Sequence, residues 1–194
     1  FVQAGMYMRP QYYPQAGETI DDAYERETAH VRKKVGICDV TSLGKIEIVG
    51  PDAGEFLDRV YINMFSTLKV GKARYGVMLR EDGIVYDDGT TSRFAEDRFF
   101  MTTTTAKGGP VMAYPERCLE IDWPELKVRV SSVSERWGGM AVAGPDARAT
   151  LIAAFPSVDF SNEAFPFMGV VHAEHNGAKL ILLRISFSGE MAFE

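Results

Sequence analysis

Ile46-Glu47-Ile48-Val49-Gly50-Pro51-Asp52-Ala53 indicates the fold, because its pattern returns 94 positions later as Met140–Ala147, which reads MAVAGPDA. In each copy an alternating apolar segment breaks at Gly-Pro. Proline suits the first turn of a helix, where its missing N–H had no partner, and the following Asp complements the positive helix start. The chain therefore repeats the order strand, GPDA, helix, which predicts a duplicated half-domain with helices that begin at Pro51 and Pro145.

The other structural signals favour an α+β fold. Thr19 and Asp22 have the spacing of a capping box ahead of a helix of about four turns. The dipeptide Asp82-Gly83 predicts a hairpin turn, and Phe1–Gly17 is expected to be irregular. Strand and helix signals mix without the βαβ alternation of a doubly wound fold. We expect duplicated half-domains of mixed or antiparallel sheet with flanking helices, in half-repeats of about 37–120 and 121–194.

Composition excludes some classes of partner. The net charge is −6 and no run is rich in Lys or Arg, so a nucleic-acid surface is disfavoured. No apolar run is long enough to cross a bilayer, and no signal peptide is present. The two cysteines, Cys38 and Cys118, are too few for a disulfide framework, which favours reduced thiols in a cytoplasmic protein. The chain starts at Phe1 rather than Met and stops at Glu194 in what reads as mid-strand, so we expect a piece of a longer protein.

Common catalytic and metal-binding patterns are missing. Only three histidines occur, and the pair His172 and His175 lies beside Asn176-Gly177, a turn dipeptide. Two histidines near a hairpin are a weaker signal for a metal than for a solvated surface, so no metal site is expected. The sequence has no GxSxG elbow, and it has no GxGxxG or GxxxxGK[ST] loop to hold a dinucleotide phosphate.

Two adjacent carboxylates, Asp87 and Asp88, follow the predicted hairpin strand. Asp marks turns so often that a solvated turn is one reading of them. In the other reading the pleat of a strand turns one carboxylate inward and the other outward. An inward carboxylate in a concave site can accept a proton or hold a cationic nitrogen. The residues alone leave both readings open.

Several separated motifs resemble the aminomethyltransferase (glycine-cleavage T-protein) family, over nearly the whole chain and in the family's order. They are Asp39–Ile46, Arg74–Asp88, Arg184–Glu190 and Phe193–Glu194. Further stretches are similar to one branch, the folate domain of the alpha subunit of bacterial heterotetrameric sarcosine oxidase. These stretches are Arg9–Pro14, Trp123–Val128 and Asn162–Met168. The resemblance implies a folate-binding fold whose closing C-terminal barrel would lie beyond Glu194.

The resemblance also implies site residues. Asp87 matches the family's essential carboxylate beside folate N5 and N10, so we expect Asp87 rather than Asp88 to face the central cavity. Tyr75 matches a tyrosine that lines the cavity, and Glu194 matches the glutamate that grips the pterin, since a carboxylate can accept two parallel hydrogen bonds from its amino-pyrimidinone edge. Phe187 replaces a tyrosine of true aminomethyltransferases and Thr104 replaces an asparagine, and both departures favour the sarcosine-oxidase branch.

The chemistry that the resemblance implies is one-carbon transfer. A flavin elsewhere in the enzyme would oxidise sarcosine to a methylene imine, and this domain would trap the imine on tetrahydrofolate, giving glycine and 5,10-methylenetetrahydrofolate. FAD, FMN and NAD would belong only to the complete enzyme, together with the other sarcosine oxidase subunits as partners, and the isolated piece would be a poor enzyme. Two alternatives remain: a stand-alone aminomethyltransferase of the glycine cleavage type, and a non-catalytic folate-binding regulatory module.

Overall fold

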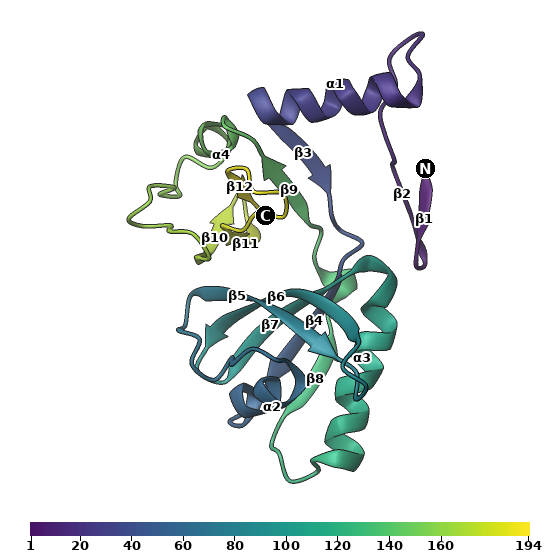
Figure 1. The fold of residues 1–194 in the computed structure, drawn as a ribbon. Helices are drawn as coiled ribbons and strands as arrows, with labels where there is room; N and C mark the ends of the chain where they lie inside the picture. The colour runs from purple at the N-terminus through teal and green to yellow at the C-terminus, as the bar shows by residue number, and fades with distance from the viewer. The chain divides into compact units, whose positions relative to one another are not determined.

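The computed structural model describes residues 1–194, which fold into two compact units (Figure 1). One unit is a single segment, Thr41–Gly138, and we refer to it as the continuous unit. The discontinuous unit combines Phe1–Val40 with Gly139–Glu194. All strand pairs in both units are antiparallel, and helices accompany them, so the α+β prediction is confirmed.

A five-stranded sheet in the order β5-β6-β7-β4-β8 forms the frame of the continuous unit. Its strands are β4 (Gly44–Val49), β5 (Lys72–Leu79), β6 (Val85–Ala95), β7 (Arg98–Thr103) and β8 (Arg129–Ser132). Its helices are α2 (Ala53–Val60) and α3 (Gly108–Arg117), with a π-helical turn at Cys118–Asp122 and 3-10 turns at Thr105–Lys107 and Ser134–Arg136. The turn between β5 and β6 contains Gly83 at φ 81°, as the Asp-Gly dipeptide predicts.

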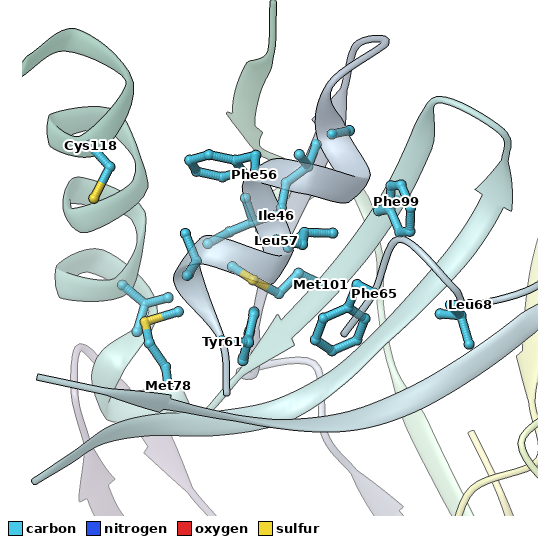
Figure 2. Packing of buried hydrophobic residues seen from close by; sticks show 14 residues of the cluster. Ile46, Phe56, Leu57, Tyr61, Phe65, Leu68, Met78, Phe99, Met101 and Cys118 are labelled. Atoms are coloured by element: carbon cyan, nitrogen blue, oxygen red, sulfur yellow. The ribbon is translucent and has the colours of Figure 1, made fainter. Parts of the chain in front are cut away.

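The core of the continuous unit lies between one face of this sheet and helix α2 (Figure 2). Ile46 and Ile48 alternate along β4 and are 1% and 0% exposed. Phe56 and Leu57 of α2 are both fully buried, and the Phe56 ring meets Trp123 edge to face at 6.1 Å between centroids. Each such side chain contributes about 1.5–3 kcal/mol relative to exposure, so this face fixes the register of the sheet.

The discontinuous unit contains a three-stranded sheet in the order β12-β9-β3 and two separate hairpins. Its strands are β1 (Val2–Ala4), β2 (Tyr7–Arg9), β3 (Gly36–Asp39), β9 (Met140–Ala143), β10 (Val170–His175), β11 (Ala178–Leu183) and β12 (Ala192–Phe193). Its helices are α1 (Ile20–Lys33) and α4 (Ala147–Ala154). A cluster of Phe160, Phe165 and Phe193 packs with Leu151 and Leu182 to form the core of this unit.

The duplication read from the sequence extends through both halves of the chain. The order strand, strand, helix, hairpin, strand occurs as β3-β4-α2-β5-β6-β7 and again as β8-β9-α4-β10-β11-β12. Gly50 and Gly144 have φ values of 150° and 125°, a region that glycine alone adopts readily. The two copies therefore bend at the same glycine in the same unusual conformation.

The helices of the two copies begin at Ala53 and Ala147, two residues later than the prolines predict. In each copy the alanine N–H donates to the carbonyl of the glycine three residues earlier, at 3.0 Å. Gly-Pro-Asp thus forms a turn in front of the helix, and the proline lies in that turn instead of in the first helical position.

The two halves exchange their first strands. Strand β3 precedes β4 in the chain but pairs with β9, with Gly36 opposite Ala143. Strand β8 precedes β9 but pairs with β4, with Ile46 opposite Ser132. The boundaries between the two compact units consequently lie between residues 40 and 41 and between residues 138 and 139. The half-repeats of about 37–120 and 121–194 stay a prediction from the sequence.

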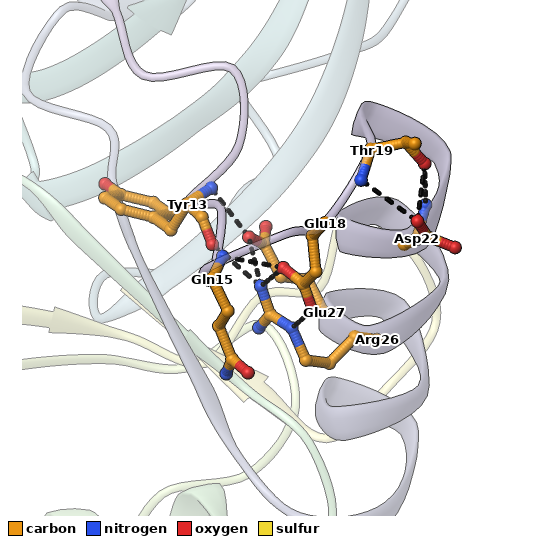
Figure 3. Close-up of polar contacts among 7 residues, drawn as sticks. All are labelled: Tyr13, Gln15, Glu18, Thr19, Asp22, Arg26 and Glu27. Atoms are coloured by element: carbon orange, nitrogen blue, oxygen red, sulfur yellow. Dashed lines mark hydrogen bonds and ion pairs between the residues drawn. The ribbon is translucent and has the colours of Figure 1, made fainter.

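Helix α1 begins with the capping box that the sequence predicts (Figure 3). The Asp22 N–H donates to Thr19 Oγ1 at 3.2 Å, and the Thr19 N–H donates to Asp22 Oδ2 at 3.0 Å. Arg26 then ties the helix to the preceding loop, donating to Glu18 Oε1 at 2.6 Å and to the Tyr13 carbonyl at 2.7 Å. These contacts order the segment that leads into the helix.

The expectation that Phe1–Gly17 is irregular is wrong for its first part. Strands β1 and β2 form a short hairpin, with Val2 opposite Arg9 and Ala4 opposite Tyr7. Gly5 turns the chain at φ 60°, so the glycine that suggested irregular structure makes the tight turn possible.

None of the helices in the chain is long and apolar enough to cross a membrane.

Candidate functional site

The β5–β6 pair separates the two adjacent carboxylates onto opposite faces of the sheet. Val77 lies opposite Asp88, and Met78 lies opposite Asp87. Residues opposite each other in an antiparallel pair share a face, and successive residues alternate. Met78 is fully buried in the core, so Asp87 is on the core side, whereas Asp88 shares the other face with Tyr75. The pleat thus directs one carboxylate inward and one outward, which is one of the two readings that the residues alone left open. That Asp87 faces a central cavity stays a prediction.

Tyr75 and Asp88 form a hydrogen-bonded pair on the face of the sheet opposite the core side, which we call the open face. The Tyr75 hydroxyl donates to Asp88 Oδ2 at 2.8 Å, and the tyrosine side chain is exposed. The hydrogen bond to Asp88 is the main cause that raises the pKa of Tyr75, so the phenol stays protonated at neutral pH. The pair presents a hydroxyl and a carboxylate together at the surface of the continuous unit. Such a pair can accept a proton from a ligand nitrogen or hold a ligand N–H.

Asp87 is 6% exposed and is held by one residue, Thr104. The Thr104 hydroxyl donates to Asp87 Oδ1 at 2.8 Å, and its backbone N–H donates to Oδ2 at 3.1 Å. Burial chiefly, with the negative charges of Asp87 and Asp88 adding to it, raises the pKa of Tyr61. The inward carboxylate therefore ties β6 to the end of β7 and gives a negative charge to the core-side environment.

A row of polar side chains crosses the open face beside the Tyr75–Asp88 pair. Tyr75 lies opposite Thr90, the Thr90 and Thr102 hydroxyls are 3.1 Å apart, and Thr102 lies opposite Lys45. Lys45 is 5% exposed, and its Nζ donates to the carbonyls of Thr41 at 2.7 Å and Leu43 at 3.0 Å. Thr102 and Thr104 thus each form a hydrogen bond with a polar neighbour, Thr90 and Asp87 respectively. The sequence analysis did not identify Lys45. Its only signal in the sequence is its place next to Ile46 in an alternating strand, which puts it on the face opposite Ile46.

Glu194, the third predicted site residue, belongs to the discontinuous unit. Its backbone is held in an exchange of two hydrogen bonds with Leu183, each 2.8 Å long. Glu194 also follows β12, whose Phe193 is in the core of that unit. Tyr75 and Asp87 both belong to the continuous unit, where Tyr75 contacts Asp88 and Asp87 contacts Thr104. The described residues include no group of three or more His, Cys, Asp and Glu side chains that could hold a metal ion.

Comparison with known proteins gives a consistent set of relatives. A family model described as the GCVT N-terminal domain matches residues 1–194. The chain is 52% identical over 197 residues to the sarcosine oxidase subunit alpha of Rhizobium meliloti (strain 1021), covering 100% of the chain and 20% of that protein. It is 30% identical over 164 residues to an aminomethyltransferase of Listeria monocytogenes serotype 4a (strain HCC23), covering 84% of the chain and 43% of that protein. The chain thus spans about a fifth of the sarcosine oxidase relative.

Solved structures agree in fold. The glycine cleavage system aminomethyltransferase T from Bartonella henselae matches with a TM-score of 0.74 and 26% identity, over 87% of this chain and 43% of that one. The heterotetrameric sarcosine oxidase from Corynebacterium sp. U-96, in complex with pyrrole 2-carboxylate, matches with a TM-score of 0.57 and 12% identity. That match covers 88% of this chain and 82% of the other, and it concerns the fold alone.

Proposed function

This chain belongs to the GCVT N-terminal domain family, and from that premise we propose that it is the folate-binding, one-carbon transfer domain of a sarcosine oxidase alpha subunit. The observation that carries the proposal is the 52% identity to such a subunit over the whole chain. The aminomethyltransferase relative is 30% identical over 84% of the chain, so the stand-alone transferase is the weaker alternative. The flavins, NAD and partner subunits belong in this proposal to the complete enzyme.

The proposed reaction joins the methylene carbon of the sarcosine-derived imine to tetrahydrofolate, giving 5,10-methylenetetrahydrofolate and glycine. Two new carbon–nitrogen bonds replace the carbon–nitrogen double bond of the imine, and the two folate N–H protons end on the amine of glycine. Tetrahydrofolate supplies the nucleophilic amines when it is bound. The protein contributes position and a group that receives and returns protons.

Two neighbouring carboxylates are candidates for the proton-handling role. The resemblance assigns it to Asp87, whose oxygens both accept from Thr104. The geometry of the sheet favours Asp88 for direct contact, because Asp88 shares the open face with Tyr75. We therefore assign Asp88 and Tyr75 to the ligand-facing surface. Asp87 acts through Thr104, as the carboxylate that holds the end of β7 in place.

Glu194 is proposed to hold the pterin ring, through two parallel hydrogen bonds from the amino-pyrimidinone edge to its carboxylate. What supports this role in the structure is the fixed backbone of Glu194, which exchanges hydrogen bonds with Leu183. A glutamine in its place keeps one acceptor and adds a donor that opposes the pterin N–H groups. Glu194→Gln in the complete enzyme should raise the tetrahydrofolate concentration needed for half-maximal trapping, with sarcosine oxidation unchanged.

Asp88→Asn and Asp87→Asn in the complete enzyme test the assignment. Loss of a general base typically costs about 10²–10⁴-fold in rate, so Asp88→Asn should cut methylenetetrahydrofolate formation by at least a hundredfold. Sarcosine oxidation by the flavin should continue, and the untrapped imine should hydrolyse to formaldehyde. Asp87→Asn should have a smaller effect on trapping and a larger one on thermal stability.

The two variants also decide between carboxylates. A trapping defect confined to Asp87→Asn would assign the base to Asp87. Equal loss of oxidation and trapping in both variants would mean that the carboxylates are structural. A complete enzyme that oxidises no sarcosine and transfers a one-carbon unit from a lipoyl carrier would replace the proposal with the aminomethyltransferase alternative.

A further inference from the structure

Two guanidinium groups in the discontinuous unit converge on one neutral side chain. Arg148, in the first turn of α4, and Arg184, just after β11, each donate to Asn162 Oδ1 at 2.8 Å. Both also approach the Met191 sulfur, at 3.7 and 3.9 Å. Like charges are thus held around a shared amide oxygen and a shared thioether.

No carboxylate neutralises this pair. Neither Arg148 nor Arg184 takes part in an ion pair, and every polar partner of theirs is neutral. Of the eleven other arginines of the chain, seven pair with carboxylates: Arg26, Arg32, Arg59, Arg80, Arg93, Arg98 and Arg117. Burial, followed by the positive charge of Arg148, lowers the pKa of Arg184 from its ordinary value. The two charges therefore repel each other without a local anion to offset the repulsion.

The neutral contacts hold both groups in place. Arg184 donates to the Phe165 carbonyl at 3.0 Å, and Arg148 donates to the Phe160 carbonyl. The Arg148 guanidinium also stacks over the ring of buried Phe193, 6.0 Å from its centroid. A guanidinium has five N–H donors, and these contacts use only its terminal nitrogens, so each Nε–H remains for a ligand. Because the side chains are already ordered, a ligand would not have to immobilise them.

We propose that Arg148 and Arg184 form a binding site for a carboxylate group. The two oxygens of a carboxylate can accept hydrogen bonds from the remaining N–H donors of the two guanidinium groups, and both positive charges attract it. Asn162, at the centre of the pair, is exposed, so a ligand can approach from solvent. The site stands on the arginine pair and does not rest on the proposed function. That function adds one source of carboxylate, the glutamyl tail of a folate.

Glutarate, a simple dicarboxylate, is the probe for the site. Calorimetry and thermal unfolding of the protein should show millimolar binding and a midpoint that rises with glutarate concentration. Arg148→Gln should weaken glutarate binding at least about tenfold, as expected for the loss of one charge-assisted hydrogen bond. Arg148→Lys keeps the positive charge but lacks the planar N–H donors of a guanidinium, so its affinity for glutarate should lie between those of the wild type and Arg148→Gln. Arg129→Gln is the matched control, because Arg129 is an exposed arginine of the other unit.

Arg184→Gln removes the contact to the Phe165 carbonyl and can weaken folding, so the decision rests on Arg148 and on the wild type. Glutarate that binds Arg148→Gln as tightly as the wild type would overturn the proposal. So would the absence of glutarate binding to the wild type at low ionic strength, where screening is weakest.

A second arm identifies the source of the carboxylate. Tetrahydropteroate, which lacks the glutamate, is compared with tetrahydropteroylglutamate in the complete enzyme, both wild type and Arg148→Gln. If the tail is the ligand, removing it weakens binding to the wild type about tenfold and leaves binding to the variant unchanged. Equal binding of both pterins to the wild type, with glutarate bound as above, assigns the site to a free carboxylate. A failure of all pterin binding, with glutarate still bound, would count against the proposed function and leave the carboxylate site standing.

Discussion

Replacing Gly50 with alanine should destabilise the continuous unit strongly, because two separate costs coincide there. Gly50 has φ 150°, and a Cβ added to it would lie 2.0 Å from the Lys127 carbonyl oxygen. A non-glycine residue in a glycine-only conformation costs about 1–3 kcal/mol. Backbone movement to relieve the collision costs about another 1–3 kcal/mol, as in an overpacked core. The sum is about 2–6 kcal/mol, a large part of the usual stability of about 5–15 kcal/mol.

Gly83→Ala is the matched control. Gly83 has φ 81° in the β5–β6 turn, and a Cβ there would meet nothing within 4 Å. Only the conformational cost remains, about 1–2 kcal/mol. For a chain of this size, 1 kcal/mol shifts the midpoint by about 2–4 °C. Gly50→Ala at about 4 kcal/mol should therefore unfold about 8–16 °C below the wild type, and Gly83→Ala only a few degrees below it.

Urea unfolding followed by tryptophan fluorescence measures both variants in the relevant unit. Trp123 and Trp137 are the only tryptophans of the chain, and both belong to the continuous unit. Trp123 packs on Phe56 in the core, so its emission reports loss of that packing. Equal urea midpoints for Gly50→Ala and Gly83→Ala would refute the reasoning, because the contact with the Lys127 carbonyl would then carry no cost.

Other parts of the chain give further predictions. In the second copy of the repeat, Gly144→Ala should lower the circular-dichroism melting midpoint far more than Gly177→Ala, since a Cβ at Gly144 would lie 2.3 Å from the Lys34 carbonyl and one at Gly177 meets nothing. Thr19→Ala should cost about 0.5–2 kcal/mol at pH 7 through loss of the N-cap. Hydrogen bonds from the Thr19 side chain and then its backbone lower the pKa of Asp22 below its ordinary 3.8, so the Asp22 contribution is complete above that pH. The contribution is lost as the pH falls further, through the folded-state pKa of Asp22. The melting midpoints of the wild type and Thr19→Ala should therefore converge in that range, and a difference that stays constant would contradict this. Burial chiefly raises the pKa of the Cys118 thiol, which is 1% exposed, whereas Cys38 is exposed. Ellman's reagent should modify one thiol of the native protein quickly, and Cys38→Ser should abolish that fast phase.

Local signals in the sequence predicted the local structure well. The capping box at Thr19 and the turn glycines Gly83 and Gly177 follow from chemistry within four residues, and the structure confirms them. The repeat of GPDA likewise predicted two equivalent strand–turn–helix units, although the helices begin at Ala53 and Ala147. Each of these features depends on side chains that are neighbours in the chain.

Features that depend on distant pairing could not be predicted in the same way. Nothing in the sequence near β3 or β8 says that each pairs with the strand of the other half. Opposite faces for Asp87 and Asp88 were only one of two readings that the sequence offered, and it does not say which of the two shares a face with Tyr75. Arg148 and Arg184 are far apart in the chain, and only the folded unit brings them to Asn162.

The exchange of β3 and β8 has a consequence for the ancestry of this domain. A single ancestral half, made as a separate chain, would offer its first strand to a second copy and receive one in return, which is a swapped symmetric dimer. Fusing two such copies tethers donor and acceptor within one chain. The tether replaces the concentration of free chains with a fixed effective concentration, so assembly of the two sheets no longer depends on how much protein is present. Each half is then free to diverge: one copy presents the Tyr75–Asp88 pair and the other the Arg148–Arg184 pair.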